Sequence, residues 1–285
     1  MIRLSRPEDL PRLKAMWMEA FHDSPEATDF YFAKRNRYDN LLVDEQDGHL
    51  RGMLSMLPID LVSGGRAYPA RYFFAIATDL RFRGQGISTA LIREAEAITR
   101  GRGEVASLLV PAGEDLFRFY GKRGYETVFS YDLLHLTPDM LPPCPADARL
   151  LQVDAAAWTR LRDAAFGQSW LFARWDTEAL DYVVQAAAAW EAPMLRFEAR
   201  GGEGMAYCEW DGDTLVVKDL ALRGLDAHTA CAILHRELHA QAYALRLPQG
   251  AVPGGATPVP FGMINWLNPF EMQPGSAPYL SLGKD

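Results

Sequence analysis

A cluster of prolines in the middle of the chain limits most strongly how the sequence can fold. Pro138, Pro142, Pro143 and Pro145 fall within residues 137–148. Proline has a fixed φ and no backbone N–H, so this stretch cannot continue a helix or a central strand. Two hydrophobic cores are expected in a chain of 285 residues, because domains usually contain about 100–150 residues. We therefore predict a domain over residues 1–137, a linker over 138–148 and a second domain over 149–285.

The first half of the chain alternates between strand and helix signals. Period-two alternation of apolar residues predicts strands, and apolar residues at helical spacing, such as Ile87 and Leu91, predict helices. In chain order we expect a strand over 1–5, helices over 7–21 and 25–35, strands over 40–44, 50–62 and 68–78, a helix over 87–101, a strand over 105–111, a helix over 115–122 and a strand over 126–136. This order predicts a mixed α/β fold that contains an antiparallel meander.

The second half repeats much of this order. We expect a strand over 149–153, helices over 155–166 and 177–190, strands over 194–199, 204–210 and 214–222, and a helix over 227–242, followed by further strands. Asp79-Leu80 corresponds to Asp219-Leu220 in this comparison. Asp226 stands where the first half has Gly86, and its carboxylate would repel an anionic ligand. If the halves are duplicates, only the first half retains an anion site.

Composition and charge exclude several classes of protein. Hydrophobic residues make up 49% and charged residues 23% of the chain, which is typical of a folded domain. There is no apolar run of the roughly 20 residues that a spanning helix needs, and no signal peptide at the start, so we expect a cytoplasmic protein without membrane contact. The net charge of −8 argues against nucleic-acid binding and favours a cationic small molecule or a basic peptide as partner. A homo-oligomer is compatible with this sequence.

Neither the cysteines nor the histidines predict a metal or disulfide framework. Cys144, Cys208 and Cys231 are far apart and lack the spacing of a zinc site. His235 and His239 are one helical turn apart, but the sequence shows no third ligand, and zinc normally requires at least three. We expect no metal.

A glycine-containing loop connects the strand ending at Thr78 to the helix beginning near Ile87. Its sequence is Arg81-Phe-Arg83-Gly84-Gln-Gly86, in which two glycines allow a sharp turn and a close approach of the backbone to a ligand. Amides of the loop and of the first helical turn then converge where the helix dipole favours an anion such as a diphosphate. A plain strand-to-helix turn with solvated arginines is the alternative that this spacing leaves open. The Walker and dinucleotide-binding patterns are both absent.

The loop resembles the acyl-CoA-binding motif of the GNAT acyltransferases, R/Q-x-x-G-x-G/A. Downstream, Phe119-Tyr120-Gly-Lys-Arg-Gly124-Tyr125 resembles the FY-x-K-x-GF segment of that family. The resemblance covers residues 1–136, and the layout is similar to the Eis-like tandem GNAT proteins. It implies an N-terminal GNAT fold followed by a second, degenerate GNAT-like domain.

The resemblance also implies which residues hold acetyl-CoA. Pantetheine would lie where the strand ending at Thr78 separates from the strand over 105–111, and Arg81 would add charge-assisted hydrogen bonds to phosphate. The implied contact residues of acetyl-CoA are Ile76, Ala77, Thr78, Arg81, Arg83, Gly84, Gln85, Gly86, Ile87, Ser88 and Thr89.

The implied chemistry is direct transfer of an acetyl group from acetyl-CoA to an amine, with Tyr120 as the general acid. Helix spacing alone favours a core aromatic at Tyr120, and the linked motif reverses that order. The general base is not identified: Glu19, His22 and Asp23 border the acceptor region of such a fold, and the C-terminal residue Asp285 is a further candidate. Two other functions stay open, a non-catalytic acyl-CoA-binding module and a tandem-GNAT aminoacyl or thiol-sugar transferase.

Aromatic residues of the second half are candidates for an acceptor pocket. Trp170, Trp175 and Tyr182 could line such a pocket between the two halves, and core packing is the alternative.

Overall fold

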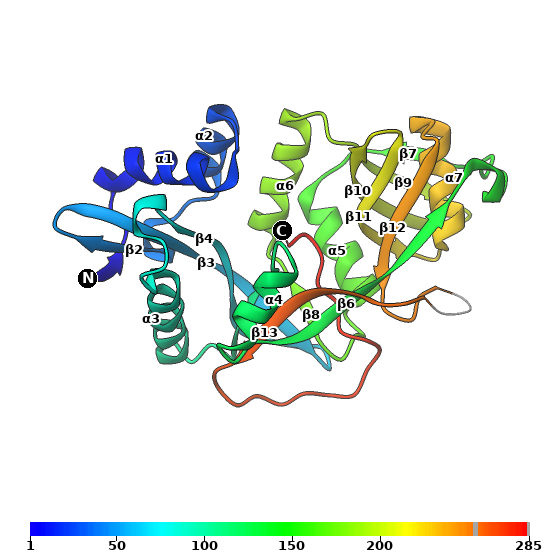
Figure 1. Cartoon of the computed structure of the whole chain (residues 1–285). Coiled ribbons are helices and arrows are strands. Elements are labelled where there is room, and N and C mark those ends of the chain that lie inside the picture. The colour runs from blue at the N-terminus through cyan, green and yellow to red at the C-terminus, as the bar shows by residue number, and fades with distance from the viewer. Residues whose placement is uncertain (253–255, 284–285) are drawn as a thin grey trace.

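The chain folds into a long mixed β-sheet with helices on both faces (Figure 1). The computed structural model describes residues 1–252 and 256–283. Within these ranges the strand order is β1-β2-β3-β4-β5-β13-β6-β12-β11-β10-β9-β7, and β8 pairs with β3. The mixed α/β fold expected from the sequence is confirmed.

The first half follows the predicted order of elements closely. It contains β1 (Ile2–Leu4), α1 (Leu10–Phe21), α2 (Pro25–Lys34), β2 (Leu41–Gln46), β3 (His49–Ser63), β4 (Arg66–Thr78), α3 (Ile87–Gly101), β5 (Ala106–Leu109), α4 (Glu114–Gly121) and β6 (Glu126–Leu136). Local signals explain the helix starts: Ser24 accepts a hydrogen bond from the Ala27 amide (3.2 Å) at the beginning of α2, and Pro25 occupies the first helical position.

The second half differs from the sequence prediction in two places. It contains β7 (Arg149–Leu151), α5 (Ala155–Phe166), β8 (Phe172–Arg174), α6 (Thr177–Ala189), β9 (Met194–Ala199), β10 (Gly202–Asp211), β11 (Thr214–Arg223), α7 (Ala227–Leu238), β12 (Ala242–Pro248) and β13 (Val259–Trp266). The last helix ends at Leu238 rather than at residue 242, because His239 adopts a left-handed conformation (φ 53°) that terminates it. The short strand β8 has no sequence signal of its own and is fixed by pairing with β3.

The last strand lies inside the sheet of the first half. β13 pairs with β5 through Met263 and Leu109, and with β6 through Ile264 and Glu126. β6 then continues into the second half, where Leu136 pairs with Tyr243 of β12. One sheet therefore spans both halves. The division at residues 137–148 stays a prediction, and β13 crosses it.

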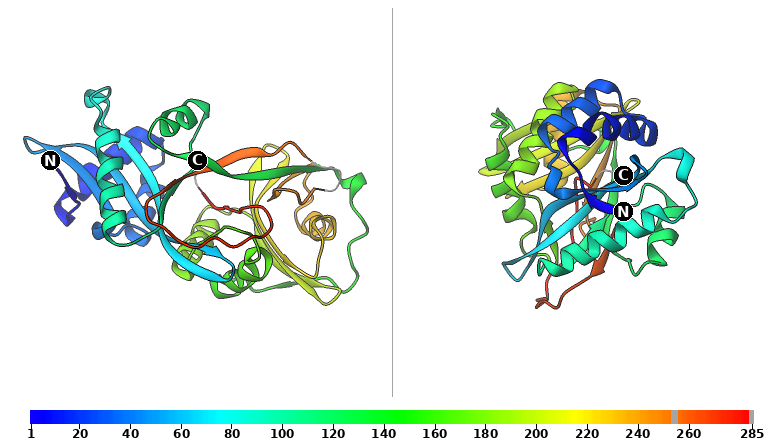
Figure 2. Two further views of the ribbon diagram at one scale, coloured as in Figure 1. Left: turned by 90° about the horizontal axis from the view of Figure 1, so that it is seen from below. Right: turned by 90° about the vertical axis from the view of Figure 1, so that its left-hand side faces the viewer.

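Helices cover both faces of the sheet in the first half (Figures 1 and 2). On one face, Trp17 of α1 and Tyr31 of α2 pack with Ala75 of β4. On the other face, Leu91 of α3 packs with the neighbouring β4 residue Phe73. Phe74, the residue directly after Phe73, points to the first face and contacts Trp17, because successive residues of a strand point in opposite directions.

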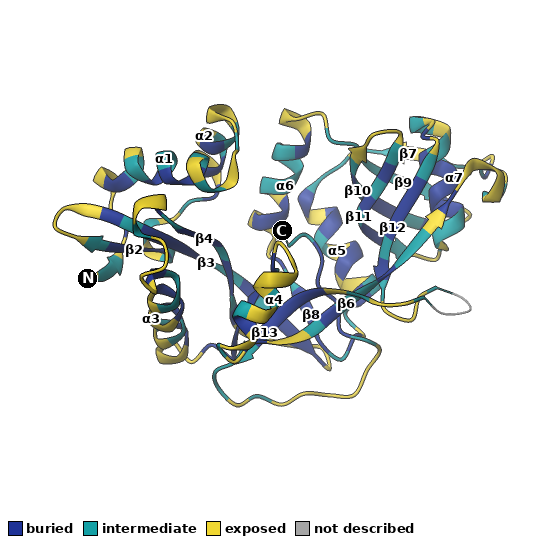
Figure 3. Ribbon diagram, in the orientation of Figure 1, coloured by how far each residue is buried: buried dark blue, intermediate teal, exposed yellow. Residues whose placement is uncertain are grey.

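A shared core joins the two halves (Figure 3). The same hydrophobic cluster contains Tyr72 and Leu108 from the first half and Trp158, Trp175 and Leu180 from the second. Burial therefore continues from one half to the other, in the region that also holds the candidate site.

Candidate functional site

An opening in the sheet lies between β4 and β5. These strands are parallel, and they pair only at Arg71 with Ser107 and at Tyr72 with Leu108. β4 continues to Thr78, whereas β5 ends at Leu109. The two strands therefore separate beyond Tyr72, as the sequence resemblance implies.

A distortion of β4 marks the edge of this opening. The pairing register between β3 and β4 shifts between Met53 and Ser55. Opposite this shift, Ala75 has a φ of 51°, in the left-handed region that residues with a Cβ seldom adopt. Such strained bulges are frequent beside functional sites. Ile76, Ala77 and Thr78, which follow the bulge, are the predicted partners of the pantetheine amides, and this assignment stays a prediction.

The glycine loop has the backbone shape that a phosphate cradle needs. Gly84 and Gly86 both have positive φ values, 78° and 77°, and a Cβ added to either would meet no atom within 4 Å. The loop therefore faces open space. α3 begins directly after Gly86, and no side chain caps its N-terminus. The first-turn amides of Ile87, Ser88 and Thr89 have no acceptor within the helix, so they are available to an anion.

The two arginines of the loop, Arg81 and Arg83, differ in their hydrogen-bond partners. Arg81 donates to the Asp79 carboxylate (2.7 and 3.1 Å), which also binds Arg12 of α1. These hydrogen bonds, first that from Arg81, hold the pKa of Asp79 well below its usual range. Arg83 is exposed, and its Nε lies 3.5 Å from the Thr78 carbonyl oxygen. Arg81 is thus already paired with a carboxylate, and the phosphate-binding roles of both arginines stay predictions.

A third arginine, Arg123, was not identified from the sequence. Its guanidinium donates to the Thr89 hydroxyl (2.6 Å from Nη2) and to the Phe119 carbonyl oxygen (2.6 Å). It also lies over the Phe119 ring, 3.3 Å from the centroid. Because Thr89 is in the first turn of α3, this contact places a cation beside the amides of the loop. The sequence signal was only its position inside the second motif.

Tyr120 is held on the α3 face of the sheet. It is 7% exposed and belongs to the same cluster as Phe73 and Ile87. Its ring contacts Phe119 and Tyr125 edge to face. Burial raises the pKa of Tyr120 to about 12, and the positive charge of Arg123 opposes that rise. The phenol is therefore protonated throughout the neutral range.

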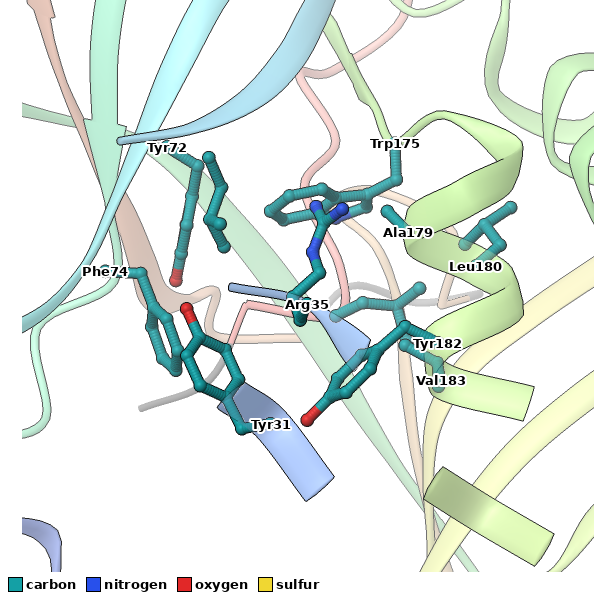
Figure 4. A pocket seen from close by; sticks show the side chains of 11 residues that line it. Tyr31, Arg35, Tyr72, Phe74, Trp175, Ala179, Leu180, Tyr182 and Val183 are labelled. Atoms are coloured by element: carbon teal, nitrogen blue, oxygen red, sulfur yellow. The ribbon is translucent and has the colours of Figure 1, made fainter. Parts of the chain in front are cut away.

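A pocket lies on the other face, between the two halves (Figure 4). Tyr72 and Phe74 of β4 form one wall, and Trp175 with residues of α6 forms the opposite wall. The complete lining comprises Tyr31, Arg35, Leu57, Tyr72, Phe74, Trp175, Ala179, Leu180, Tyr182, Val183 and Leu282. Trp175 and Tyr182 line this pocket between the two halves, which was one of the two possibilities that the sequence left open for them; the other was core packing.

Trp170 is placed elsewhere. Its carbonyl oxygen accepts a hydrogen bond from Ser63 (2.7 Å), and its amide donates to Ser276 (2.8 Å). It is part of the packing around β3, outside the pocket lining.

Arg35 is the charged residue of the pocket lining. It follows α2 directly, and its amide donates to the Tyr31 carbonyl oxygen (2.8 Å). The residue is 7% exposed, and its Nη2 is buried without a hydrogen-bond partner among the described residues. Sequence reasoning missed this residue, because nothing in the primary structure distinguishes it from the neighbouring exposed Lys34.

The three candidate general bases near the end of α1 do not line the pocket. Glu19 pairs with Arg12, and Asp23 accepts a hydrogen bond from the Trp17 indole (2.8 Å). His22 is an exposed residue at the end of α1. Asp285 lies outside the described residues. Sequence reasoning and structure thus leave the base unassigned.

The corresponding region of the second half is not an anion cradle. The Asp226 carboxylate accepts hydrogen bonds from the amide (2.8 Å) and hydroxyl (2.7 Å) of Thr229 and caps α7. His235 contacts the Tyr243 hydroxyl (2.7 Å). Within residues 1–252 and 256–283 there is no group of three or more His, Cys, Asp or Glu side chains placed to hold a metal ion.

Part of the chain matches a known protein family. Residues 1–128 match a family model described as an acetyltransferase (GNAT) domain. A comparison with curated proteins found no match. Across the described ranges, no helix has the length and apolar character required to cross a membrane.

Solved structures resemble nearly the whole chain. One is a conserved protein of unknown function from Enterococcus faecalis V583, described as a probable N-acyltransferase (TM-score 0.76, 15% identity, 94% of this chain and 72% of that chain). Another is a GCN5-related N-acetyltransferase from Anabaena variabilis (TM-score 0.76, 17% identity, 94% and 73%). A third is Eis1 from Mycobacterium abscessus (TM-score 0.69, 16% identity, 94% and 74%). At these identities the likeness concerns the fold.

Proposed function

We propose that this chain is a GNAT acyltransferase that transfers an acetyl group from acetyl-CoA to an amine acceptor, on the premise that its residues 1–128 match the model of a GNAT acetyltransferase domain. The observation that carries the proposal is the separation of β4 from β5 beyond Tyr72. It connects the face that holds the glycine loop and Tyr120 with the face that holds the pocket. Acetyl-CoA held by the loop on one face could therefore extend through the sheet and place its thioester beside an amine acceptor on the other face.

The residues of the first half fit the chemical groups of acetyl-CoA. The open loop at Gly84 and Gly86 and the amides of Ile87, Ser88 and Thr89 would bind the pyrophosphate, with the Arg123 guanidinium nearby. The β4 backbone after the Ala75 bulge would bind the pantetheine amides. When bound, acetyl-CoA supplies an activated acyl group.

Tyr120 is the proposed proton donor, and the Ala77 amide is proposed to polarise the thioester carbonyl. With a pKa of about 12, Tyr120 holds its proton in the resting protein. A free thiol has a pKa of about 8.5, so transfer of this proton to a solvated thiolate would be uphill. Burial disfavours the thiolate as it disfavours the phenolate, and a thiolate formed beside Tyr120 is therefore a stronger base than in water.

Two measurements test the proposed function. Calorimetry with CoA checks binding, and release of free thiol from acetyl-CoA with a panel of amines checks turnover. We expect binding, turnover with at least one amine and an acetyl mass shift on that amine. Binding without turnover would support the non-catalytic module, and a larger mass shift after incubation with an aminoacyl donor would support the aminoacyl transferase. Absence of CoA binding would overturn both the acetyltransferase and the non-catalytic acyl-CoA-binding module.

A further inference from the structure

Arg35 is a buried cation whose charge no described residue neutralises. It is 7% exposed, it lines the pocket, and its Nη2 has no hydrogen-bond partner among the described residues. Figure 4 shows it in the middle of the labelled side chains, with residues of β4 on one side and residues of α6 on the other. A cation in such a place is costly unless an anion pairs with it, because burial removes its water.

Other arginines with little exposure in this protein have carboxylate partners. Arg162, 1% exposed, pairs with the buried Asp219 and donates to Ser281 (2.8 Å). Arg71 pairs with Glu104 (2.6 Å) and also donates to Asn40 (3.2 Å). Arg35 makes no side-chain hydrogen bond or ion pair within the described ranges. Arg35 therefore differs from Arg162 and Arg71 in that no described carboxylate pairs with its guanidinium.

The pocket wall offers no anion of its own among its described residues. Apart from Arg35, the lining consists of aromatic and aliphatic side chains. Burial raises the pKa of both Tyr31 and Tyr182, so their hydroxyls stay protonated and cannot serve as counter-ions. The charge of Asp23 also reaches Tyr182, but its carboxylate accepts the Trp17 indole hydrogen bond outside the lining. Because none of the described lining residues supplies a negative charge, we look for it in a ligand.

We propose that the amine acceptor carries a carboxylate that pairs with Arg35 and an apolar body that fills the aromatic pocket, as in an amino acid with an apolar side chain. The inference rests on the proposed function and names its acceptor class. It departs from the cationic acceptor predicted from the net charge, because a ligand responds to the local charge of the pocket more strongly than to the sum over the molecule.

The transfer balances with such an acceptor. The neutral amine nitrogen forms a bond to the acyl carbon, and the carbon–sulfur bond of acetyl-CoA breaks. One proton of the amine leaves to water, and the sulfur receives the proton of Tyr120, which water restores. The acceptor carboxylate takes no part in these bonds and keeps its ion pair with Arg35, so the N-acetyl amino acid and CoA are the products.

Matched pairs of amines test the inference on the unaltered protein. L-phenylalanine and 2-phenylethylamine differ only by the carboxylate, as do L-leucine and 3-methylbutylamine. We expect kcat/KM with acetyl-CoA to be at least about tenfold higher for the amino acid of each pair, because the pairing involves a charged, desolvated group. Equal or higher kcat/KM for the amines without a carboxylate would overturn the inference while leaving the proposed function intact.

Substitution of Arg35 assigns the preference to this residue. Arg35→Gln should remove the preference by lowering kcat/KM for the amino acids far more than for the amines that lack the carboxylate, and Arg35→Lys should retain part of the preference. Lys34→Gln is the matched control, because it removes an exposed charge one residue away. A preference that persists in Arg35→Gln would contradict the assignment. Thermal unfolding shows whether Arg35→Gln folds. If this variant does not fold, the comparison of the amine pairs on the wild type still tests the carboxylate preference.

Binding without acetyl-CoA separates this inference from the proposed function. N-acetyl-L-phenylalanine should raise the unfolding temperature of the wild type, whereas N-acetyl-2-phenylethylamine should raise it less, and Arg35→Gln should abolish the difference. An Arg35-dependent shift without turnover on any amine would support the carboxylate site and overturn the proposed function. Arg35-dependent preference for succinyl-CoA over acetyl-CoA, with amines that lack a carboxylate, would place the anion on the acyl group and overturn the inference.

Discussion

At the scale of single residues, Tyr120 combines burial with a retained proton. Its pKa of about 12 results mainly from burial, so the hydroxyl is a proton donor and not a base in the resting protein. Tyr120→Phe removes the hydroxyl and retains the ring contacts with Phe119 and Tyr125. We expect kcat to fall about 10²-fold or more, the contribution typical of a positioned acid, with little change in the affinity for CoA.

Steady-state kinetics together with calorimetry check this prediction. Because the pKa lies far above neutrality, the wild-type kcat should not decline between pH 7 and 9 through loss of the Tyr120 proton. Unchanged turnover in Tyr120→Phe would remove Tyr120 from the mechanism. Tyr131→Phe is the matched control, because it removes the same hydroxyl from a tyrosine of β6 outside the site.

Arg123 illustrates a residue whose importance depends on its contacts. It bonds Thr89 in the first turn of α3 and stacks on Phe119. We expect Arg123→Ala to weaken CoA binding about 5- to 30-fold, in line with the loss of one charge-assisted phosphate contact worth about 1–2 kcal/mol. Arg118→Ala, the loss of an exposed arginine of α4, the helix that ends just before Arg123, should have little effect. Equal CoA affinity of both variants, measured by calorimetry, would show that Arg123 has only a structural role.

At the scale of elements, the loop before α3 is the feature most sensitive to a side chain. A Cβ at Gly86 finds space, so the obstacle is charge and the positive φ rather than a clash. Gly86→Asp should abolish measurable CoA binding by placing a carboxylate among the amides. Gly212→Asp is the matched control, since Gly212 also has a positive φ (57°) and open surroundings, in the turn after β10. CoA binding by Gly86→Asp at wild-type affinity would exclude the loop as the cradle.

Asp226, at the start of helix α7, is the residue of the second half that corresponds to Gly86. Asp226 caps the helix, and its hydrogen bonds with Thr229 lower its pKa. We expect Asp226→Ala to lower the free energy of unfolding by about 1 kcal/mol at pH 7, as for other N-cap losses. Acetyl-CoA binding should not change.

The pH dependence of this effect has a defined sign. Because the folded pKa of Asp226 is lowered, its stabilisation is present above the unfolded value of about 3.9 and is lost as the pH falls towards the folded pKa. The difference between wild type and Asp226→Ala should therefore narrow below about pH 4. Urea unfolding at pH 7 and in acid measures both differences, and a difference that grows in acid would contradict the cap.

At the scale of the whole molecule, β13 ties the two halves together. Ile264 is fully buried between β5 and β6, and a common core extends through Tyr72 and Trp175. We expect one cooperative unfolding transition and a loss of about 2–5 kcal/mol in Ile264→Ala. Differential scanning calorimetry checks both. Two separate transitions for the halves would show that they unfold independently, as the predicted division at residues 137–148 would allow.

The pocket is also a property of the whole molecule. One wall comes from α2, β3 and β4 and the other from Trp175 and α6, so neither half encloses it alone. Binding of the proposed acceptor would therefore depend on the packing of the second half against the first.

The sequence by itself determined the local features of this protein. Hydrophobic periodicity, capping residues and paired glycines depend on neighbours within a few positions, and they predicted nearly all helices and strands, the loop before α3 and the place of Tyr120. Tertiary structure alone decided the rest. The insertion of β13 between β5 and β6, the pairing of Arg81 with Asp79 and the isolation of Arg35 all depend on residues distant in the chain. Burial and charge compensation are set by what packs around a side chain, and no periodicity in the sequence encodes that.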